Sequence, residues 1–182
     1  QHPRGKEFVF SSRKVTNPLR PLSTQLGVLG QAGATAYFGL LDIGRLKAGD
    51  KVLVSGAAGG IGSVAGEIAR IRGAGLVVGT AGSDAKCRWL REELGYDAVI
   101  NYKTENVTER LAELFPDGID VFFDNVGGDI LNEALGRLAM HARIVICGFI
   151  STDYAPGTHH GPINYQRIVY KRARTEGYVV LD

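Results

Sequence analysis

The glycines between Gly56 and Gly62, in the run GAAGGIG, are the residues whose spacing points most clearly to chemistry. They follow the apolar stretch Lys51–Ser55 and precede apolar residues at helical spacing from Ile61 to Ala69. A glycine turn between a strand and a helix lets the backbone approach a pyrophosphate, which the free N–H groups at the start of the helix can bind. The alternative is a turn required only for tight packing. No Lys-Ser or Lys-Thr pair follows the glycines, which excludes a Walker loop.

The run also fits the dinucleotide fingerprint G-x-G-x-x-G/A, with Ala57, Gly59 and Gly62 at its three special positions. Alanine therefore replaces the first glycine. Gly59 would leave room for the pyrophosphate, and Gly62 would let the helix pack closely on the sheet. Because the strand–turn–helix context is met, we predict a dinucleotide site here.

The residue types at the end of the second predicted strand indicate whether a site prefers NAD or NADP. A site for NAD usually places Asp or Glu at this tip, but the run GTAGS at 79–83 contains no acid. Asp84 follows as a first-turn helix residue that complements the helix dipole. Lys86 offers a cation for a 2′-phosphate, with a solvated helix lysine as the alternative. We therefore predict NADP(H) as the cofactor.

Short apolar stretches alternate with amphipathic helical patterns along the chain, and they predict the elements that position these residues. Ser83 and Asp129 are predicted helix caps. Continuous apolar strands between helices indicate a parallel sheet covered on both faces. The prediction is an α/β doubly wound parallel six-stranded sheet, a Rossmann fold with helices on both faces, in the order 3-2-1-4-5-6. The predicted strands are residues 51–55, 76–80, 98–101, 119–124, 143–148 and 178–181.

Composition limits the remaining possibilities. The 182 residues are 45% apolar and 22% charged, which is typical of one globular domain. A net charge of +2 is too balanced to indicate nucleic-acid or membrane binding, and the basic clusters near both ends are interpreted as solvated edges. No apolar run is long enough for a transmembrane helix. The two cysteines lie in apolar patterns, which favours a reducing, cytoplasmic compartment.

Seven strings in the correct order resemble the zinc-independent medium-chain dehydrogenase/reductases. The similar branch contains the prostaglandin reductases, the leukotriene hydroxydehydrogenases and the alkenal double-bond reductases. The strings are GATAYFG (33–39), SGAAGGIG (55–62), AGSDAKC (81–87), NYK (101–103), FDNVGG (123–128), CGFIS (147–151) and GPINY (161–165).

The resemblance implies an enzyme that uses NADPH to reduce the carbon–carbon double bond of a small α,β-unsaturated ketone or aldehyde. A hydride would pass to the β-carbon, and no metal would be required. The resemblance places the pyrophosphate at the glycine turn, the 2′-phosphate and ribose near Lys86 and Tyr102, and the nicotinamide near 147–151. The implied cofactor-binding residues are Gly59, Gly60, Ile61, Gly62, Ser83, Lys86, Tyr102, Asn125, Cys147, Gly148, Phe149, Ile150 and Ser151.

The sequence departs from the family pattern at two places. The family tyrosine after the Ile-Ser pair aligns with Asp153 here, so Tyr154 fills its catalytic role only if the loop is one residue longer. The family's GroES-like catalytic domain has no counterpart. We therefore expect residues 1–30 to be an irregular lead-in from that domain and 31–182 to be the NADP-binding domain, inactive in isolation.

Other functions compatible with the sequence are an NADPH quinone or enoyl-thioester reductase, and a non-catalytic NADP-binding or interaction module. The resemblance also implies a homodimer through the edge of the sixth strand. His159 and His160 could form a metal pair, but solvated loop residues are the favoured interpretation.

Overall fold

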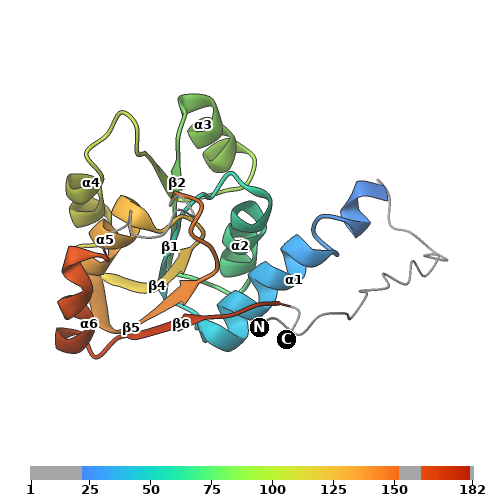
Figure 1. The fold of residues 1–182 in the computed structure, drawn as a ribbon. Helices are drawn as coiled ribbons and strands as arrows, with labels where there is room; N and C mark the ends of the chain where they lie inside the picture. Colours follow the sequence, from blue (N-terminus) through green and yellow to red (C-terminus); the bar gives the residue numbers. More distant parts are fainter. Residues whose placement is uncertain (1–21, 152–160, 181–182) are drawn as a thin grey trace, which may run out of the picture.

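A six-stranded parallel sheet forms the centre of the computed structural model, which describes residues 22–151 and 161–180 (Figure 1). The strand order is β3-β2-β1-β4-β5-β6 and every neighbouring pair is parallel, so the predicted Rossmann topology is confirmed. The strands are β1 (Lys51–Val54), β2 (Leu76–Ala81), β3 (Ala98–Asn101), β4 (Ile119–Asp124), β5 (Leu138–Ile146) and β6 (Arg174–Gly177).

Helices cover both faces of this sheet, as Figure 1 shows. The α-helices are α1 (Gln31–Phe38), α2 (Gly60–Ile71), α3 (Asp84–Glu92), α4 (Val107–Leu114), α5 (Gly128–Gly136) and α6 (Arg167–Tyr170). Three further helical segments are the 3₁₀ turns η1 (Leu22–Gln25) and η3 (Ile163–Gln166) and the π-helical segment η2 (Gly39–Ile43), which continues α1.

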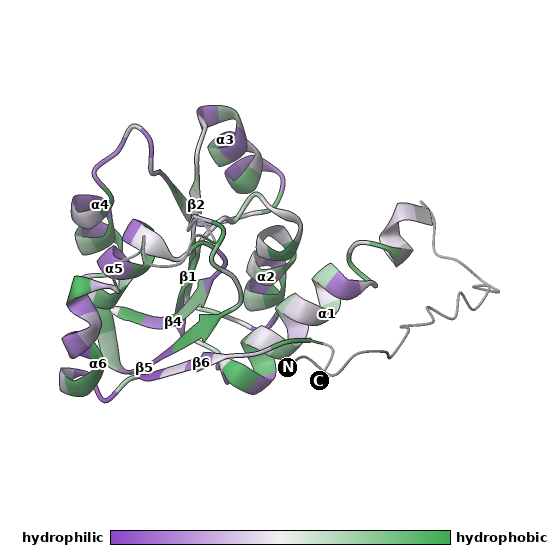
Figure 2. Ribbon diagram, in the orientation of Figure 1, coloured by the Kyte–Doolittle hydropathy of each residue, from purple (hydrophilic) through white to green (hydrophobic). Residues whose placement is uncertain are grey.

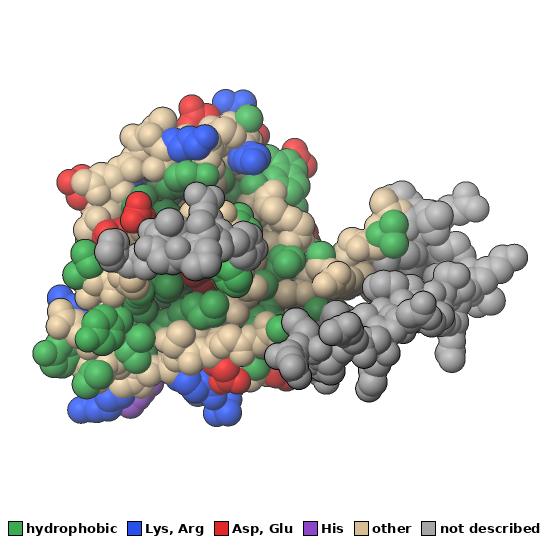
Figure 3. All heavy atoms as spheres, viewed as in Figure 1, with side chains coloured by type: hydrophobic (Ala, Val, Ile, Leu, Met, Phe, Trp, Pro, Cys, Tyr) green, Lys and Arg blue, Asp and Glu red, His purple; other side chains and the backbone are tan. Residues whose placement is uncertain are grey.

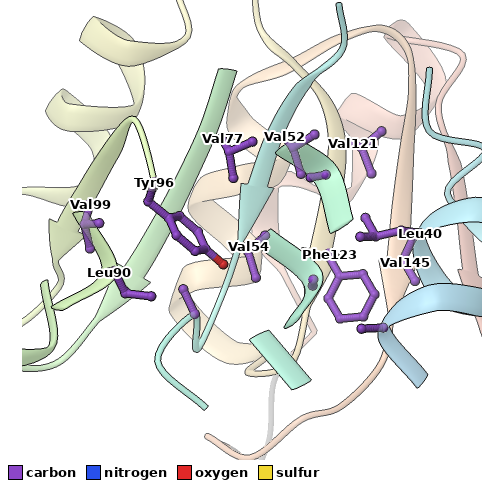
Figure 4. Close-up of a cluster of buried hydrophobic side chains, with 14 of the residues drawn as sticks. Leu40, Val52, Val54, Val77, Leu90, Tyr96, Val99, Val121, Phe123 and Val145 are labelled. Carbon is purple, nitrogen blue, oxygen red and sulfur yellow. The ribbon is translucent and has the colours of Figure 1, made fainter. Parts of the chain in front are cut away.

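The apolar core is divided into two layers by the sheet, because successive side chains of a strand point to opposite faces. Val52 and Val54 of β1 pack in one cluster with residues of α1, α2 and α3, whereas Leu53 between them packs with residues of α4 and α5. Figure 4 shows the first cluster, where Leu40 lies beside Phe123 and Val145. In Figure 2 the hydrophobic stretches of β4 and β5 lie between helices that contain both hydrophilic and hydrophobic residues.

The sixth strand is not where the sequence prediction placed it. β6 is Arg174–Gly177, which pairs with Arg143–Ile146 of β5. Tyr178, the first residue of the predicted strand, leaves the sheet because its hydroxyl donates to the Thr35 carbonyl oxygen at 2.5 Å. Tyr178 thus packs against α1 rather than pairing with β5.

Two smaller corrections concern the ends of elements. β5 begins five residues earlier than predicted, at Leu138, and ends at Ile146. Asp129 is not a cap, because the N-cap of α5 is Gly127, whose φ of 71° suits a residue without a side chain. Ser83 is confirmed as the N-cap of α3, since its hydroxyl accepts from the Lys86 N–H.

Acidic and basic side chains both appear on the face that Figure 3 shows. The basic residues predicted near the chain's end lie on α6, β6 and the turn between them, and Figure 3 shows Lys and Arg side chains along this lower edge. The first basic cluster falls within 1–21, outside the described residues. Among the residues that are described, no helix has the length and apolar character needed to cross a membrane.

Candidate functional site

A cavity of about 320 Å³ lies where the carboxyl ends of β1, β2 and β4 meet. β1 and β4 are adjacent strands, and the chain leaves them toward opposite sides of the sheet. Ligands of doubly wound folds bind at such a switch point. The residues lining the cavity are Gly56, Ala58, Gly59, Thr80, Ala81, Gly82, Lys86, Tyr102, Val126, Ile150 and Ser151.

The glycine turn borders this cavity at the start of α2. Gly59 is the N-cap and no side chain caps the helix, so α2 presents free N–H groups there. A Cβ on Gly60 would meet nothing within 4 Å, whereas a Cβ on Gly62 would lie 2.5 Å from the Gly56 carbonyl oxygen. Gly62 therefore serves close packing, and Gly59 and Gly60 leave the backbone open. Ile61 is half-buried and packs against the core.

Tyr96 supports the start of α2, a contact that the sequence analysis missed. Its side chain is 3% exposed, and its hydroxyl donates to the Gly62 carbonyl oxygen at 2.7 Å. The ring fits against Gly66, where a Cβ would lie 2.1 Å from the nearest ring atom. Burial raises the pKa of Tyr96 well above its ordinary value. Figure 4 shows this ring reaching from the β3 side into the core.

The end of the cavity beside β2 and β3 is basic and polar. Lys86 of α3 and Tyr102, just after β3, both line it. The Tyr102 hydroxyl lies 2.5 Å and the Lys103 side chain 3.3 Å from where a Gly82 Cβ would stand, so only glycine leaves these side chains their space. Lys86 forms no ion pair with any residue that the structure describes. Lys103 belongs to this group and was not predicted.

Asp84, in the first turn of α3, does not line the cavity but contacts a side chain at the end of β3. Its carboxylate accepts from the side-chain amide of Asn101 at 2.7 Å. Ser83 caps α3 beside the cavity without lining it. Among the described residues, no acidic side chain lines the cavity. An anion in this region would therefore meet cations and hydroxyl groups.

The opposite wall combines residues after β4 with residues after β5. Val126, Ile150 and Ser151 line the cavity, and the Ser151 hydroxyl donates to the Val126 carbonyl oxygen at 2.6 Å. Asn125 does not point freely into the cavity, because its side-chain amide donates to the Ser55 carbonyl oxygen at 2.8 Å. Gly148 fits closely against the Asn125 carbonyl oxygen, 3.0 Å from where a Cβ would lie.

Cys147 and Phe149 occupy the same segment without lining the cavity. Cys147 is partly buried beside Tyr178, and burial raises the pKa of its thiol. Burial also raises the pKa of the Tyr178 hydroxyl. The Phe149 side chain is half exposed. Both thiols, Cys87 included, are free, so no disulfide joins these elements.

Two buried polar residues beneath this wall were not among the predicted site residues. Ser55 and Asp124 are both 0% exposed, and the Ser55 hydroxyl donates to an Asp124 carboxylate oxygen at 2.6 Å. Burial raises the pKa of Asp124, and the hydrogen bonds to its carboxylate lower it in part. The available signal was an acid, Asp124, directly after the apolar run Val121–Phe123 of the predicted strand.

The cavity thus brings together predicted residues from four separate segments. Tyr154, His159 and His160 lie outside the described residues. Within 22–151 and 161–180, no group of three or more His, Cys, Asp or Glu side chains could hold a metal ion. The predicted residues that line the cavity are Gly59, Lys86, Tyr102, Ile150 and Ser151.

Comparisons with known proteins show that this chain is similar to part of several reductases. The family model described as "Zinc-binding dehydrogenase" matches residues 60–182. Prostaglandin reductase 1 of Bos taurus is 47% identical over 162 residues, which are 88% of this chain and 48% of that protein. The NADPH-dependent curcumin reductase of Escherichia coli is 39% identical over 168 residues, 90% of this chain and 48% of that protein.

A similar solved structure is that of CurA in complex with NADPH from Vibrio vulnificus. Its TM-score to this chain is 0.81 with 38% sequence identity, and the match covers 88% of this chain and 48% of that chain. This chain therefore spans about half the length of the relatives that it matches.

Proposed function

The chain belongs to the zinc-binding dehydrogenase family, and we propose that it is the nucleotide-binding part of an NADPH-dependent reductase. Its similarity to prostaglandin reductase 1 and to the curcumin reductase supports the branch that the sequence motifs resemble. The finer proposal is the reduction of the carbon–carbon double bond of an α,β-unsaturated ketone or aldehyde.

The cavity at the switch point carries this proposal, because its two ends match the two halves of a dinucleotide. The uncapped start of α2 at Gly59 suits a pyrophosphate, which needs N–H donors and a close backbone approach. Lys86 and Tyr102 suit the 2′-phosphate and ribose. Ile150 and Ser151 suit the nicotinamide half. NADP(H) fits the residues present, since the lining offers the ammonium group of Lys86, hydroxyl groups and the backbone N–H groups at the start of α2.

The same lining favours NADP(H) over NAD(H). A ribose with a free 2′-hydroxyl is usually held by a carboxylate at the tip of β2, and this tip ends in Ala81 and Gly82 instead. Lys86 is available for a 2′-phosphate, because no described acid pairs with it.

When bound, NADPH supplies a hydride for the β-carbon of the substrate. The chain's own residues would hold and orient the dinucleotide. Val126 and Ile150 present apolar side chains on the wall after β4 and β5, where they would keep water from the reacting ring. The Ser151 hydroxyl is already used by the Val126 carbonyl oxygen, so it stabilises this wall rather than donating a proton.

Two experiments test the proposal at its two levels. Titration of the 182-residue chain with NADPH and NADH tests the cofactor site, and weaker binding of NADH is expected. Turnover is tested with the longest gene product that contains this chain, by following NADPH absorbance with enals, enones, quinones and enoyl thioesters. Oxidation with enals and enones supports double-bond reduction. Oxidation with quinones alone, or binding without turnover, would contradict it.

The homodimer remains a proposal that follows from the resemblance. β6 is the last strand of the sheet, so its outer edge has no partner strand among the described residues. Such an edge can pair with a second copy. Sedimentation of the chain across a concentration series is the measurement, and a single monomeric species throughout would contradict the dimer.

A further inference from the structure

The wall after β4 and β5 is held to the glycine turn by one buried carboxylate. The first oxygen of Asp124 accepts from the Ser55 hydroxyl at 2.6 Å and from the Val126 N–H at 3.0 Å. The Gly127 N–H lies 3.1 Å from both carboxylate oxygens. The loop after β4 is therefore wrapped around the Asp124 side chain.

Ser55 takes part in this arrangement from the strand that leads into the glycine turn. Its hydroxyl oxygen also accepts from the Asn125 N–H at 2.8 Å, and its carbonyl oxygen accepts from the Asn125 side chain at 2.8 Å. The next residue, Gly56, lines the cavity. The hydroxyl of Ser55 thus joins the two strands at the switch point.

The segment after β5 depends in turn on the loop after β4. The Asp124 carbonyl oxygen accepts from the Cys147 N–H at 2.8 Å and the Gly148 N–H at 3.0 Å. The Val126 carbonyl oxygen accepts from both the N–H and the hydroxyl of Ser151, at 3.0 and 2.6 Å. A displacement of the loop around Asp124 would therefore move Val126 and Ser151 together.

We propose that Asp124 and Ser55 are positioning residues that fix the wall of the cavity for the nicotinamide half of the dinucleotide. This inference rests on the proposed function, because it takes the cavity to be a dinucleotide site. Neither side chain would touch the nucleotide, since both are fully buried. They act through Val126 and Ser151. The other end of the cavity, at Lys86, belongs to different elements and is not held by this pair.

A carboxylate at this position is required by the donors around it. Three donors converge on the Asp124 carboxylate, and each oxygen accepts at least one of them. In Asp124→Asn one oxygen becomes an NH₂ group, which donates and would face another donor. Ser55→Ala removes the hydroxyl but keeps the carboxylate. The two variants therefore perturb the same hydrogen-bond network, one from β4 and the other from the end of the neighbouring β1.

Two ligands allow the contributions of the two ends of the cavity to be measured separately. NADPH would contact both ends, whereas adenosine 2′,5′-bisphosphate lacks the nicotinamide half. We expect Asp124→Asn and Ser55→Ala to weaken NADPH binding by about tenfold, a change that corresponds to about 1.4 kcal/mol. Binding of the bisphosphate is expected to stay within about twofold of the unmodified chain, a difference of about 0.4 kcal/mol. A merely structural role would not produce this selectivity.

Asp120→Asn is the matched control. Asp120 lies on the same strand, and its carboxylate accepts from the Lys51 N–H at 2.9 Å, so it joins β4 to β1 at their other ends. This variant removes the charge of a carboxylate that joins the same two strands away from the cavity. We expect it to change the thermal unfolding midpoint without altering the ratio of the two dissociation constants.

The outcomes distinguish the inference from the function on which it rests. Equal weakening of both ligands, or no weakening of NADPH, in Asp124→Asn and Ser55→Ala overturns the positioning role. If Asp124→Asn fails to fold by circular dichroism, Ser55→Ala decides alone. If the unmodified chain binds neither ligand, the proposed dinucleotide site is wrong and the inference fails with it. Binding of the bisphosphate by every variant, with selective loss of NADPH, supports both.

Discussion

Replacement of Lys86 by alanine is the sharpest test of the proposed cofactor preference. Lys86 lines the cavity beside Tyr102 and Gly82, it is exposed, and no described acid pairs with it. Its charge is therefore available to a ligand. A 2′-phosphate carries nearly two negative charges and three acceptor oxygens, whereas the 2′-hydroxyl of NADH has none of that charge.

The magnitude follows from the exposure of the lysine. Two unit charges 4 Å apart attract by about 1 kcal/mol in bulk water and about 4 kcal/mol near a protein surface. Exposed ion pairs deliver about 0.2–1 kcal/mol, and hydrogen bonds to charged groups about 1.5–3 kcal/mol. A value of about 1.4 kcal/mol for Lys86 lies between these ranges, and it corresponds to a factor of about ten in the dissociation constant of NADPH.

The assay is titration of the chain with NADPH and with NADH, at low and at high salt. Lys86→Ala is expected to raise the dissociation constant of NADPH about tenfold and to leave that of NADH unchanged. Salt should reduce the difference, because it screens an exposed pair. Arg88→Ala is the control, since Arg88 lies on the same helix and carries the same charge but does not line the cavity.

Two results would refute this reasoning. The first is an unmodified chain that binds NADH at least as tightly as NADPH. The second is an equal loss for both nucleotides in Lys86→Ala, or the same loss in Arg88→Ala, either of which would show that the specific position of Lys86 does not matter.

The remaining predictions concern packing and titration. Gly62→Ala should lower the free energy of unfolding by about 1–3 kcal/mol and lower the melting temperature, because the new Cβ would lie 2.5 Å from a backbone oxygen. Gly60→Ala should leave the melting temperature unchanged, because its Cβ would stand in open space. The free energy of unfolding should fall above about pH 10. Burial raises the pKa of Tyr96 in the folded chain above its pKa in the unfolded chain. Stability is therefore lost as the pH rises above the pKa of the unfolded chain, where only the unfolded state releases the proton. Urea unfolding of Tyr96→Phe across that range should show a shallower fall. The raised pKa of Cys147 predicts slow alkylation by iodoacetamide at pH 7.5 and a rate that increases with pH, and a fast reaction at pH 7.5 would contradict it.

The fold could be predicted because its signals are local. The turn at Gly56–Gly62 and the alternation of strand and helix patterns depend on neighbouring residues, and five strands lie where these patterns indicated. The sixth strand was misplaced because its residues, Arg174–Gly177, lack an apolar pattern, whereas the apolar residues that follow begin with one that contacts a segment distant in sequence. Tyr178 bonds to Thr35, and no pattern near the end of the chain reveals that partner.

The sequence predicted those site residues that face the cavity, either with a side chain or, for glycine, with exposed backbone. Lys86 and Tyr102 were found from their types and from the family strings, and the structure brings them to one cavity. Asp124 and Ser55 were missed because they act from beneath the surface. Their role depends on which backbone N–H groups converge on a carboxylate, and a sequence does not contain that information.

The two ends of the cavity depend on different interactions, because one end is exposed to solvent and the other rests on buried residues. The end at Lys86 relies on an exposed charge, whose contribution falls with salt. The wall beside Ser151 relies on hydrogen bonds to the buried carboxylate of Asp124, which water and salt do not reach. The proposed site therefore predicts that cofactor selectivity and nicotinamide positioning are separable. Substitutions that change the first can leave the second intact, because β2 and α3 carry one and the β1–β4 switch point carries the other.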